Sequence, residues 1–198
     1  MNKYFTRENY GFLLGFIGVL IFSLTLPITR HLTQIDFTSL EIGFGRGFLA
    51  GIASVLILLF KGQFKTENLP SKTDLRKLII VAIGVVFAFP IFTAIAMQII
   101  PAGNGGIVLA AVPLSTAIFA GLLSEENPTT KFWGIAVIGF ITVIVFRLLT
   151  NDLGITYIGF GDFALLVCVV IGGMGYAQGG ILGKTMSGWN VIVWALVI

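Results

Sequence analysis

Arg46 is the residue whose type and position point most directly to chemistry, because it lies well inside an apolar stretch, residues 38–60, that is long enough to cross a membrane. At ~1.5 Å per residue it lies roughly 12 Å along a helix, near the middle of a hydrocarbon layer about 30 Å thick. A guanidinium at that depth costs about 2.5 to 3.5 kcal/mol, against roughly 5 kcal/mol from the apolar residues of the stretch. We therefore expect Arg46 to face a protein interior. There it binds an anionic group, counters a coupling proton, or holds neighbouring helices together.

Glu41 is the other charged side chain of this stretch. It lies five residues before Arg46, about 140° away around a helix at ~100° per residue, so the two do not pair on their own helix. Its depth of roughly 4 to 5 Å places it near the membrane surface. Two interpretations stay open, a proton-coupling carboxylate or a side chain that reaches water and lipid headgroups.

Neutral polar residues are the expected neighbours of Arg46, because the other apolar stretches contain no Asp or Glu except Asp162 at an outer boundary. Together with Arg46 and Glu41 they form the candidate ligand pathway. They are Thr93, Gln98, Asn104, Ser115 and Thr116.

Prolines and glycines are expected to shape the helices. Pro90 and Pro113 interrupt two apolar stretches and are interpreted either as gating hinges or as ordinary kinks. Glycines repeat every four residues in two other stretches, which predicts surfaces for close helix packing. The two stripes are Gly43, Gly47 and Gly51, and Gly175, Gly179 and Gly183.

The composition excludes several classes of function. The chain is 57% hydrophobic and 11% charged, where soluble domains carry about 25% charged residues, so it is a polytopic membrane protein. The basic residues lie between apolar blocks and form no single patch, which argues against nucleic acid as a partner. With one cysteine, Cys168, interpreted as a buried packing residue, and one histidine, His31, interpreted as an exposed loop residue, we expect no metal site, no cofactor and no catalytic residue.

Seven apolar blocks set the expected architecture: residues 11–29, 38–60, 78–97, 105–123, 132–149, 160–183 and 190–198. The first six are long enough to cross a bilayer as helices, and the seventh has about half the ~20 residues that a span needs. We therefore predict an all-α integral membrane protein with six full transmembrane helices and a partial seventh, either because the chain is a fragment or because its natural end lies elsewhere.

The distribution of Lys and Arg predicts the orientation. If the amino terminus is cytoplasmic, nine basic residues lie on the cytoplasmic side and two, Arg30 and Arg147, on the other, as the positive-inside rule requires.

A weak internal repeat accompanies this pattern. A shift of 150 residues aligns Gly11 with Gly161, and each opens an apolar block after a polar segment. Five predicted helices separate the copies, and an odd number inverts the second copy in the membrane. The sequence therefore predicts an inverted-repeat helical bundle.

Residues 105–149 combine a helix with a central proline, a tight acidic turn and a helix that opens with glycine; these positions are Pro113, Glu125, Gly134 and Gly139. This pattern resembles the end of the first EamA repeat of the drug/metabolite transporter superfamily. Three other features agree with the resemblance: Pro27 late in the first helix, Arg46 followed closely by Phe48, and Gly161-Asp162 at the start of the second repeat.

The resemblance implies residues 1–150 as the first EamA repeat with five transmembrane helices, and residues 151–198 as the start of an incomplete second repeat. It also implies a multi-pass transporter of the bacterial plasma membrane, an exporter of small organic metabolites or drugs that works by alternating access, with the fifth helix peripheral. Oligomerisation or further C-terminal helices would complete it. The alternative is a non-transporting membrane scaffold or subunit that acts through its glycine stripes.

Overall fold

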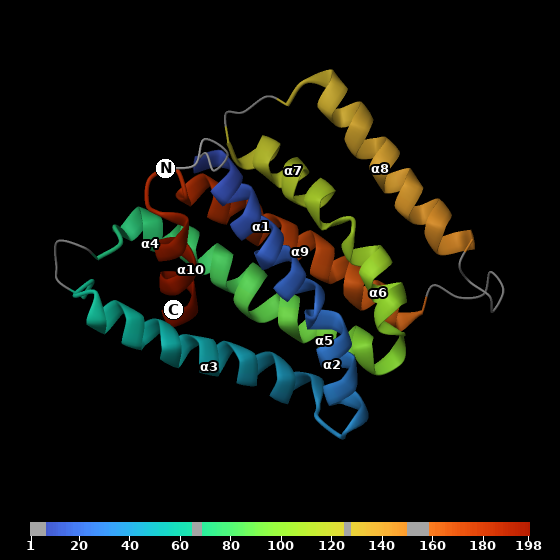
Figure 1. The fold of residues 1–198 in the computed structure, drawn as a ribbon, viewed down its shortest axis with the longest axis horizontal. Coiled ribbons are helices and arrows are strands. Elements are labelled where there is room, and N and C mark those ends of the chain that lie inside the picture. Colours follow the sequence, from blue (N-terminus) through green and yellow to red (C-terminus); the bar gives the residue numbers. More distant parts are fainter. Residues whose placement is uncertain (1–6, 65–68, 125–127, 150–158) are drawn as a thin grey trace.

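The structure, a computed structural model, describes residues 7–64, 69–124, 128–149 and 159–198, and within them all regular secondary structure is helical. Ten α-helices and one π-helix follow one another along the described chain (Figure 1). They are α1 (Arg7–Ser23), α2 (Thr25–Gln34), α3 (Ser39–Phe60), α4 (Lys72–Val81), η2 (Ala82–Ala88), α5 (Phe89–Ile99), α6 (Ala102–Leu109), α7 (Val112–Leu123), α8 (Thr130–Leu149), α9 (Phe160–Leu182) and α10 (Gly188–Val197).

Several of these helices join end to end into membrane-length segments. In the described residues, five segments are long and apolar enough to cross a membrane. Two further apolar helical stretches, in α8 and α10, are shorter. The five segments are Asn9–Gln34, Ser39–Phe60, Lys72–Ile99, Ala102–Leu123 and Phe160–Leu182. The predicted all-helical, multi-pass class is confirmed, and the count of six full spans with a partial seventh stays a prediction.

The end of the first segment differs from the sequence-based expectation. His31 is exposed as predicted, but it lies in α2 and not in a loop. The chain bends at Leu24, and Pro27 then falls in the first helical turn, where its missing N–H leaves no bond unmade. The helix therefore continues beyond Thr29 to Gln34.

Prolines mark the irregular points of the two middle segments. Pro90 is the second residue of α5, which follows directly on the π-helix η2, and the N–H of Phe89 bonds to the carbonyl of Gly84, five residues back. Pro113 lies in the first turn of α7, just after a break at Ala110 and Ala111 that separates α7 from α6. Each proline removes one backbone donor, so the backbone carbonyls before it are satisfied by other bonds.

Helix α9 lies at the centre of the bundle. It packs against α4, η2 and α5 on one side and against α6 and α7 on the other, and α3 packs against α5 and α10. Helix α8 lies at the edge, beside α6 and α7 (Figure 1). Thus a segment from the second predicted repeat is enclosed by segments of the first.

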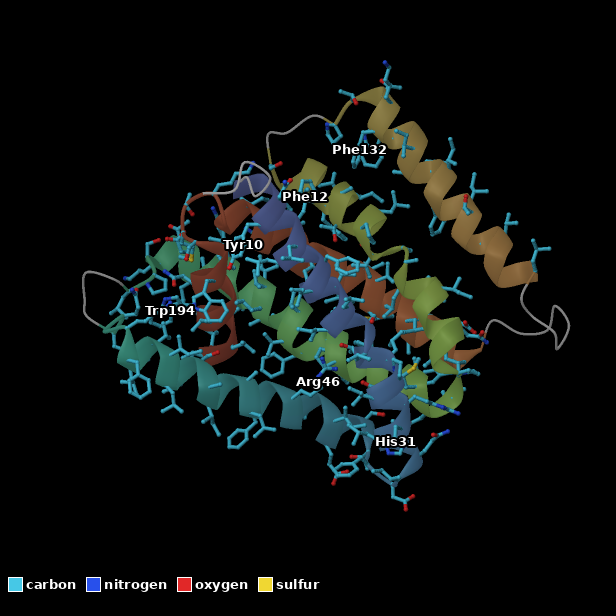
Figure 2. The ribbon with its side chains drawn as sticks, viewed as in Figure 1. Tyr10, Phe12, His31, Arg46, Phe132 and Trp194 are labelled. Atoms are coloured by element: carbon cyan, nitrogen blue, oxygen red, sulfur yellow. The ribbon has the colours of Figure 1, made fainter. Side chains whose placement is uncertain are left out.

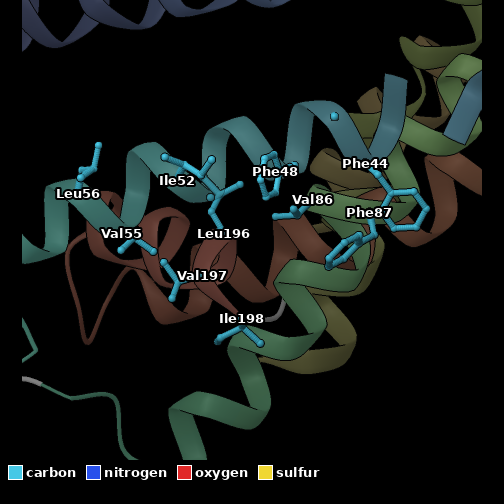
Figure 3. A pocket seen from close by; sticks show the side chains of 13 residues that line it. Phe44, Phe48, Ile52, Val55, Leu56, Val86, Phe87, Leu196, Val197 and Ile198 are labelled. Carbon is cyan, nitrogen blue, oxygen red and sulfur yellow. The ribbon is translucent and has the colours of Figure 1, made fainter. Parts of the chain in front are cut away.

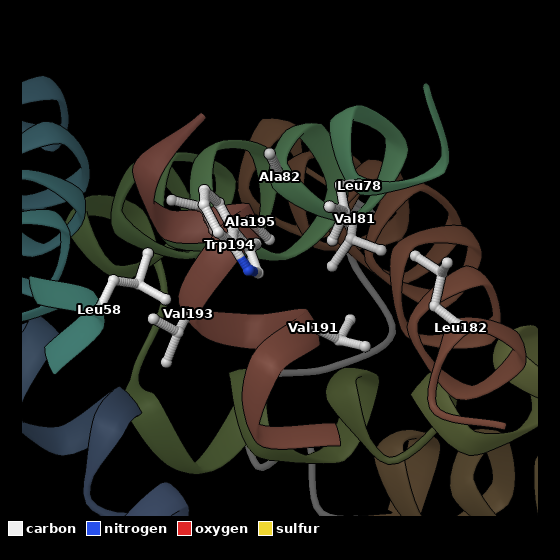
Figure 4. Packing of buried hydrophobic residues seen from close by; sticks show 10 residues of the cluster. Leu58, Leu78, Val81, Ala82, Leu182, Val191, Val193, Trp194 and Ala195 are labelled. Carbon is white, nitrogen blue, oxygen red and sulfur yellow. The ribbon is translucent and has the colours of Figure 1, made fainter. Parts of the chain in front are cut away.

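Two apolar clusters hold the helices together. The first joins the carboxyl-terminal helix α10 to α3, α4, η2 and α9, with Trp194 and Leu58 among its buried members (Figure 4). The second surrounds Met97 and Leu165 where α5 meets α9. Cys168 is completely buried, as the sequence predicted.

Candidate functional site

The guanidinium of Arg46 is directed into the bundle from the middle of α3. Figure 2 shows the side chain on the side of α3 that faces α2 and α5. It is nevertheless exposed in the described chain, so other side chains do not enclose it. A guanidinium carries five N–H donors, and the structure shows no hydrogen bond from them to the residues it describes.

Tyr176 of α9 is the ionisable side chain with which Arg46 interacts. The charge of the guanidinium acts on the phenol, although α3 and α9 are more than a hundred residues apart in sequence. Tyr176 is partly buried. A phenol O–H and a guanidinium can both donate hydrogen bonds to one anionic group.

Tyr176 belongs to a series of three aromatic rings from three helices. The ring of Phe89 in α5 packs edge-to-face on Tyr176, with 6.1 Å between ring centres and an interplanar angle of 77°. The centre of the Phe22 ring in α1 lies 5.7 Å from that of Phe89, with the two rings tilted by 42°. Phe89 is only 3% exposed whereas Phe22 is 47% exposed, so the accessible apolar surface is that of Phe22 and Tyr176.

The structure shows no ion pair of Arg46 with any of the residues it describes. Glu41, on the same helix, instead accepts hydrogen bonds from the backbone N–H and the hydroxyl of Thr38, both at 2.8 Å. Thr38 in turn accepts from the N–H of Glu41, which completes a capping box at the start of α3. Arg46 thus leaves a net positive charge at mid-span.

The neutral candidates are distributed over several places. Thr93 is completely buried, and its hydroxyl donates to the carbonyls of Phe89 and Pro90 in its own helix. Thr116 likewise donates to Val112, four residues back. These two hydroxyls are therefore used within α5 and α7.

The other three neutral candidates differ in exposure. Ser115 is buried against α9, where a Cβ on Gly173 would collide with it. Gln98 is exposed and Asn104 half-buried, both near the junction of α5 and α6. The structure shows no hydrogen bond between Arg46 and these residues in the part of the chain that it describes, and their place in a ligand pathway stays a prediction.

The glycines of α3 lie against three different elements. A Cβ on Gly43 would come within 2.5 Å of Ile91 in α5, one on Gly47 within 3.6 Å of Val86 in η2, and one on Gly51 within 3.0 Å of a carbonyl in α10. This stripe therefore faces the helices on which α3 packs.

The α9 stripe has other neighbours. Gly175 touches η2 and Gly179 lies near Val81 of α4, whereas the nearest atoms to Gly183 belong to its own helix end. The two stripes thus do not face each other. Gly84 of η2 is the closest partner of Gly175 and was not among the predicted packing residues.

Comparison with known protein families matches residues 9–148 to the EamA-like transporter family. The chain belongs to this family. It is also 39% identical over 199 residues to the uncharacterized transporter YdeK of Bacillus subtilis (strain 168), an alignment that covers 100% of this chain and 65% of that protein. The chain thus spans 65% of the length of this relative. No solved structure matches the chain.

Family membership confirms the resemblance on which the sequence-based expectation rested. One of its motif positions, Glu125, lies outside the described residues, as does the expected boundary between residues 150 and 151. Gly134 and Gly139 are in α8, and a Cβ on either would meet nothing within 4 Å. They are therefore not needed for packing among the described residues.

A separate apolar pocket of about 770 Å³ lies on another face of α3 (Figure 3). Phe44, Phe48, Phe87 and Ile198 are among the side chains that line it, and Arg46 is not. Since its lining carries no ionisable or hydrogen-bonding side chain, it offers nothing to orient a polar ligand. The space around Arg46 and Tyr176 is therefore the better candidate site in this EamA-family chain.

Sequence reasoning missed Tyr176, Phe22 and Arg30. A tyrosine within the glycine-rich apolar segment of α9 is a local signal that could have identified Tyr176. Phe22 is one of 18 phenylalanines in the chain, and nothing local distinguishes it. Arg30 was interpreted only as an orientation signal, whereas its guanidinium donates to the backbone carbonyl of Met97.

Proposed function

We propose that the protein to which this chain belongs moves a small organic metabolite or drug across the bacterial plasma membrane, as an exporter that works by alternating access. Family membership supports a membrane transporter. The observation that carries the site is the position of Arg46, at mid-span, near Tyr176 and without a carboxylate partner among the described residues. An intramembrane charge without a structural counter-charge is typical of a ligand pathway.

The proposal includes the organisation of the chain. Residues 1–150 form the first repeat and residues 151–198 begin the second, inverted one, with six full spans, a partial seventh and a cytoplasmic amino terminus. The central position of α9 supports this division, because ligand sites of inverted-repeat transporters lie where the two halves meet. Arg46 and Tyr176 would then face one another across that interface.

Export is tested in cells, with the substrate left open. The culture medium of a strain that overproduces the protein is compared by mass spectrometry with that of a strain that produces Arg46→Gln. We expect one or a few small organic compounds to accumulate with the unaltered protein and not with the variant. Arg76→Gln, which removes an exposed positive charge from α4, is the matched control and is expected to behave as the unaltered protein.

Two results would contradict the proposal. One is identical media from all strains although the proteins are present in the membrane at equal amounts. The other is accumulation that Arg46→Gln leaves unchanged. Dependence on a proton gradient is tested separately, since export that persists with an uncoupler would exclude proton coupling.

A scaffold function is the second candidate, and the contact between Gly84 and Gly175 favours it. A scaffold would depend on helix packing and not on Arg46. Substitution of Gly175 that abolishes the biological effect, combined with an Arg46→Gln variant that retains it, would therefore support the scaffold.

A further inference from the structure

We propose that the site around Arg46 selects small monoanions that carry a flat apolar ring, such as aromatic carboxylates. This inference rests on the proposed transport function and names the substrate class of the same site. It depends on three features, namely the charge at mid-span, the hydroxyl beside it and the row of rings.

The charge sets the sign of the ligand. Among the described parts of the membrane-length segments, the other charged residues lie near segment ends, and Arg30 is engaged with the carbonyl of Met97. Glu41 is engaged at the start of α3. A cation that entered would meet Arg46 with no carboxylate to offset the repulsion, and this repulsion is strong where the dielectric constant is low.

The donors set the shape of the anionic group. A guanidinium presents N–H groups as a planar fork that matches the two oxygens of a carboxylate. The phenol of Tyr176, whose ring packs on Phe89, adds a hydroxyl donor from α9. A carboxylate held by both would connect α3 to α9, which is the connection that a ligand must make if it is to favour one conformation of the two halves.

The rings set the shape of the remainder of the ligand. Phe22, Phe89 and Tyr176 come from α1, α5 and α9 and contact one another through Phe89. Tyr176 is the member of this row that interacts electrostatically with Arg46. Phe89 is buried and contacts both other rings, so Phe22 and Tyr176 supply the accessible faces. Rings stack favourably at centre separations of about 4.5 to 7 Å, so a ligand ring fits this row as a further member.

The test uses four probes that differ in one property each. Benzoate, benzamide and benzylammonium share a ring and carry a charge of −1, 0 and +1, whereas acetate keeps the carboxylate and lacks the ring. Binding to the protein purified from its native membrane is measured by isothermal titration calorimetry. We expect benzoate to bind at least about tenfold more tightly than each of the other three. Benzamide and benzylammonium lack the charge-assisted hydrogen bond, and acetate lacks the ring contact.

Variants then assign the preference to residues. Arg46→Gln is expected to weaken benzoate binding at least about tenfold, and Arg46→Lys to keep the preference for benzoate over benzylammonium. Phe22→Ala is expected to weaken benzoate by about threefold to tenfold and to leave acetate unchanged. Arg76→Gln is the charge-matched control, and the melting temperature of each variant shows whether it is folded.

The substrate class is overturned if benzoate binds no more tightly than benzamide or acetate, or if a folded Arg46→Gln variant binds benzoate as well as the unaltered protein. In either case, if a neutral or cationic compound accumulates in the medium, the proposed transport function is still supported and only the proposed substrate class is wrong. If no compound accumulates in the medium in a way that depends on Arg46, the proposed transport function itself is wrong.

Discussion

The backbones of Gly84 and Gly175 are in direct contact. A Cβ built on Gly84 would lie 2.8 Å from the Cα of Gly175, and one built on Gly175 would lie 3.0 Å from the Cα of Gly84. Gly84 belongs to the π-helix η2 and Gly175 to the central helix α9, so the irregular part of the third segment is the part that approaches α9 most closely. Only residues without a side chain allow this approach.

Alanine at either position is therefore expected to separate the two helices. We predict that Gly84→Ala and Gly175→Ala each lower the free energy of unfolding by about 1 to 3 kcal/mol, the usual cost of overpacking, because the atoms in the way are backbone and cannot rotate aside. The melting temperature of the purified protein in detergent measures the loss.

Gly180→Ala provides the matched control on the same helix, because a Cβ there would meet nothing within 4 Å. Alanine favours helix over glycine by about 1 kcal/mol, so this variant is expected to melt at the same or a higher temperature. Equal melting temperatures for Gly175→Ala and Gly180→Ala would show that the close contact does not exist in the membrane.

A second prediction concerns the carbonyl of Met97. In a continuous helix this oxygen would accept the N–H of residue 101, but that residue is Pro101 and has none. The guanidinium of Arg30 and the hydroxyl of Thr33, the latter at 3.2 Å, donate to it instead and tie α2 to α5. We expect Arg30→Gln to cost roughly 1 to 2 kcal/mol in stability and Thr33→Val about 1 kcal/mol, measured by thermal unfolding.

His31→Gln is the control for these variants, since His31 is an exposed neighbour on the same helix. It is expected to leave the melting temperature unchanged. If Arg30→Gln were as stable as His31→Gln, the carbonyl of Met97 would have to be satisfied by other means, such as water.

The sequence was sufficient to predict the helical class and the location of Arg46 within a membrane-length helix, because both follow from local hydropathy and the length of a span. It was not sufficient to find the neighbour of Arg46. Tyr176 lies 130 residues further along the chain, and which helices meet is decided by packing between distant segments.

The irregular helices were only partly predictable. Pro90 and Pro113 were visible as interruptions; a helix break precedes Pro113, and a π-helix precedes Pro90 in a helix that continues. The π-helical turn before Pro90 was not predicted, because a missing N–H can be accommodated by a kink, a break or a wider turn. In the structure the wider turn contains Gly84, which contacts Gly175. This contact joins residues 91 positions apart, so the local sequence could not reveal it.

Cys168 leads to a third prediction. Its side chain is completely buried, and its sulfur lies 3.7 Å from the carbonyl oxygen of Phe89. Because reagents cannot reach it, we expect maleimide to leave it unmodified in the folded protein and to modify it in sodium dodecyl sulfate. A cysteine introduced by Lys61→Cys at the exposed end of α3 serves as the control and should react in both conditions. Reaction of Cys168 in the folded protein would place α9 at the surface.

The last prediction distinguishes the two interpretations of Glu41. Its carboxylate accepts two hydrogen bonds from Thr38, and this fits a role in starting α3. Since the amide oxygen of Gln can accept the same backbone bond, we predict that Glu41→Gln keeps both stability and export, and that Glu41→Leu loses about 1 kcal/mol of stability. Melting temperature and export into the medium are measured for both variants.

The first turn of α4 supplies a matched control for Glu41→Leu. There Ser71 accepts from the N–H of Asp74 and donates to its carboxylate, so Asp74→Leu should cost a similar amount of stability. A carboxylate that carries a coupling proton cannot be replaced by an amide, because Gln does not titrate. If Glu41→Gln were folded and yet exported nothing, Glu41 would be a proton carrier that also caps α3, and the capping role alone would be an insufficient account.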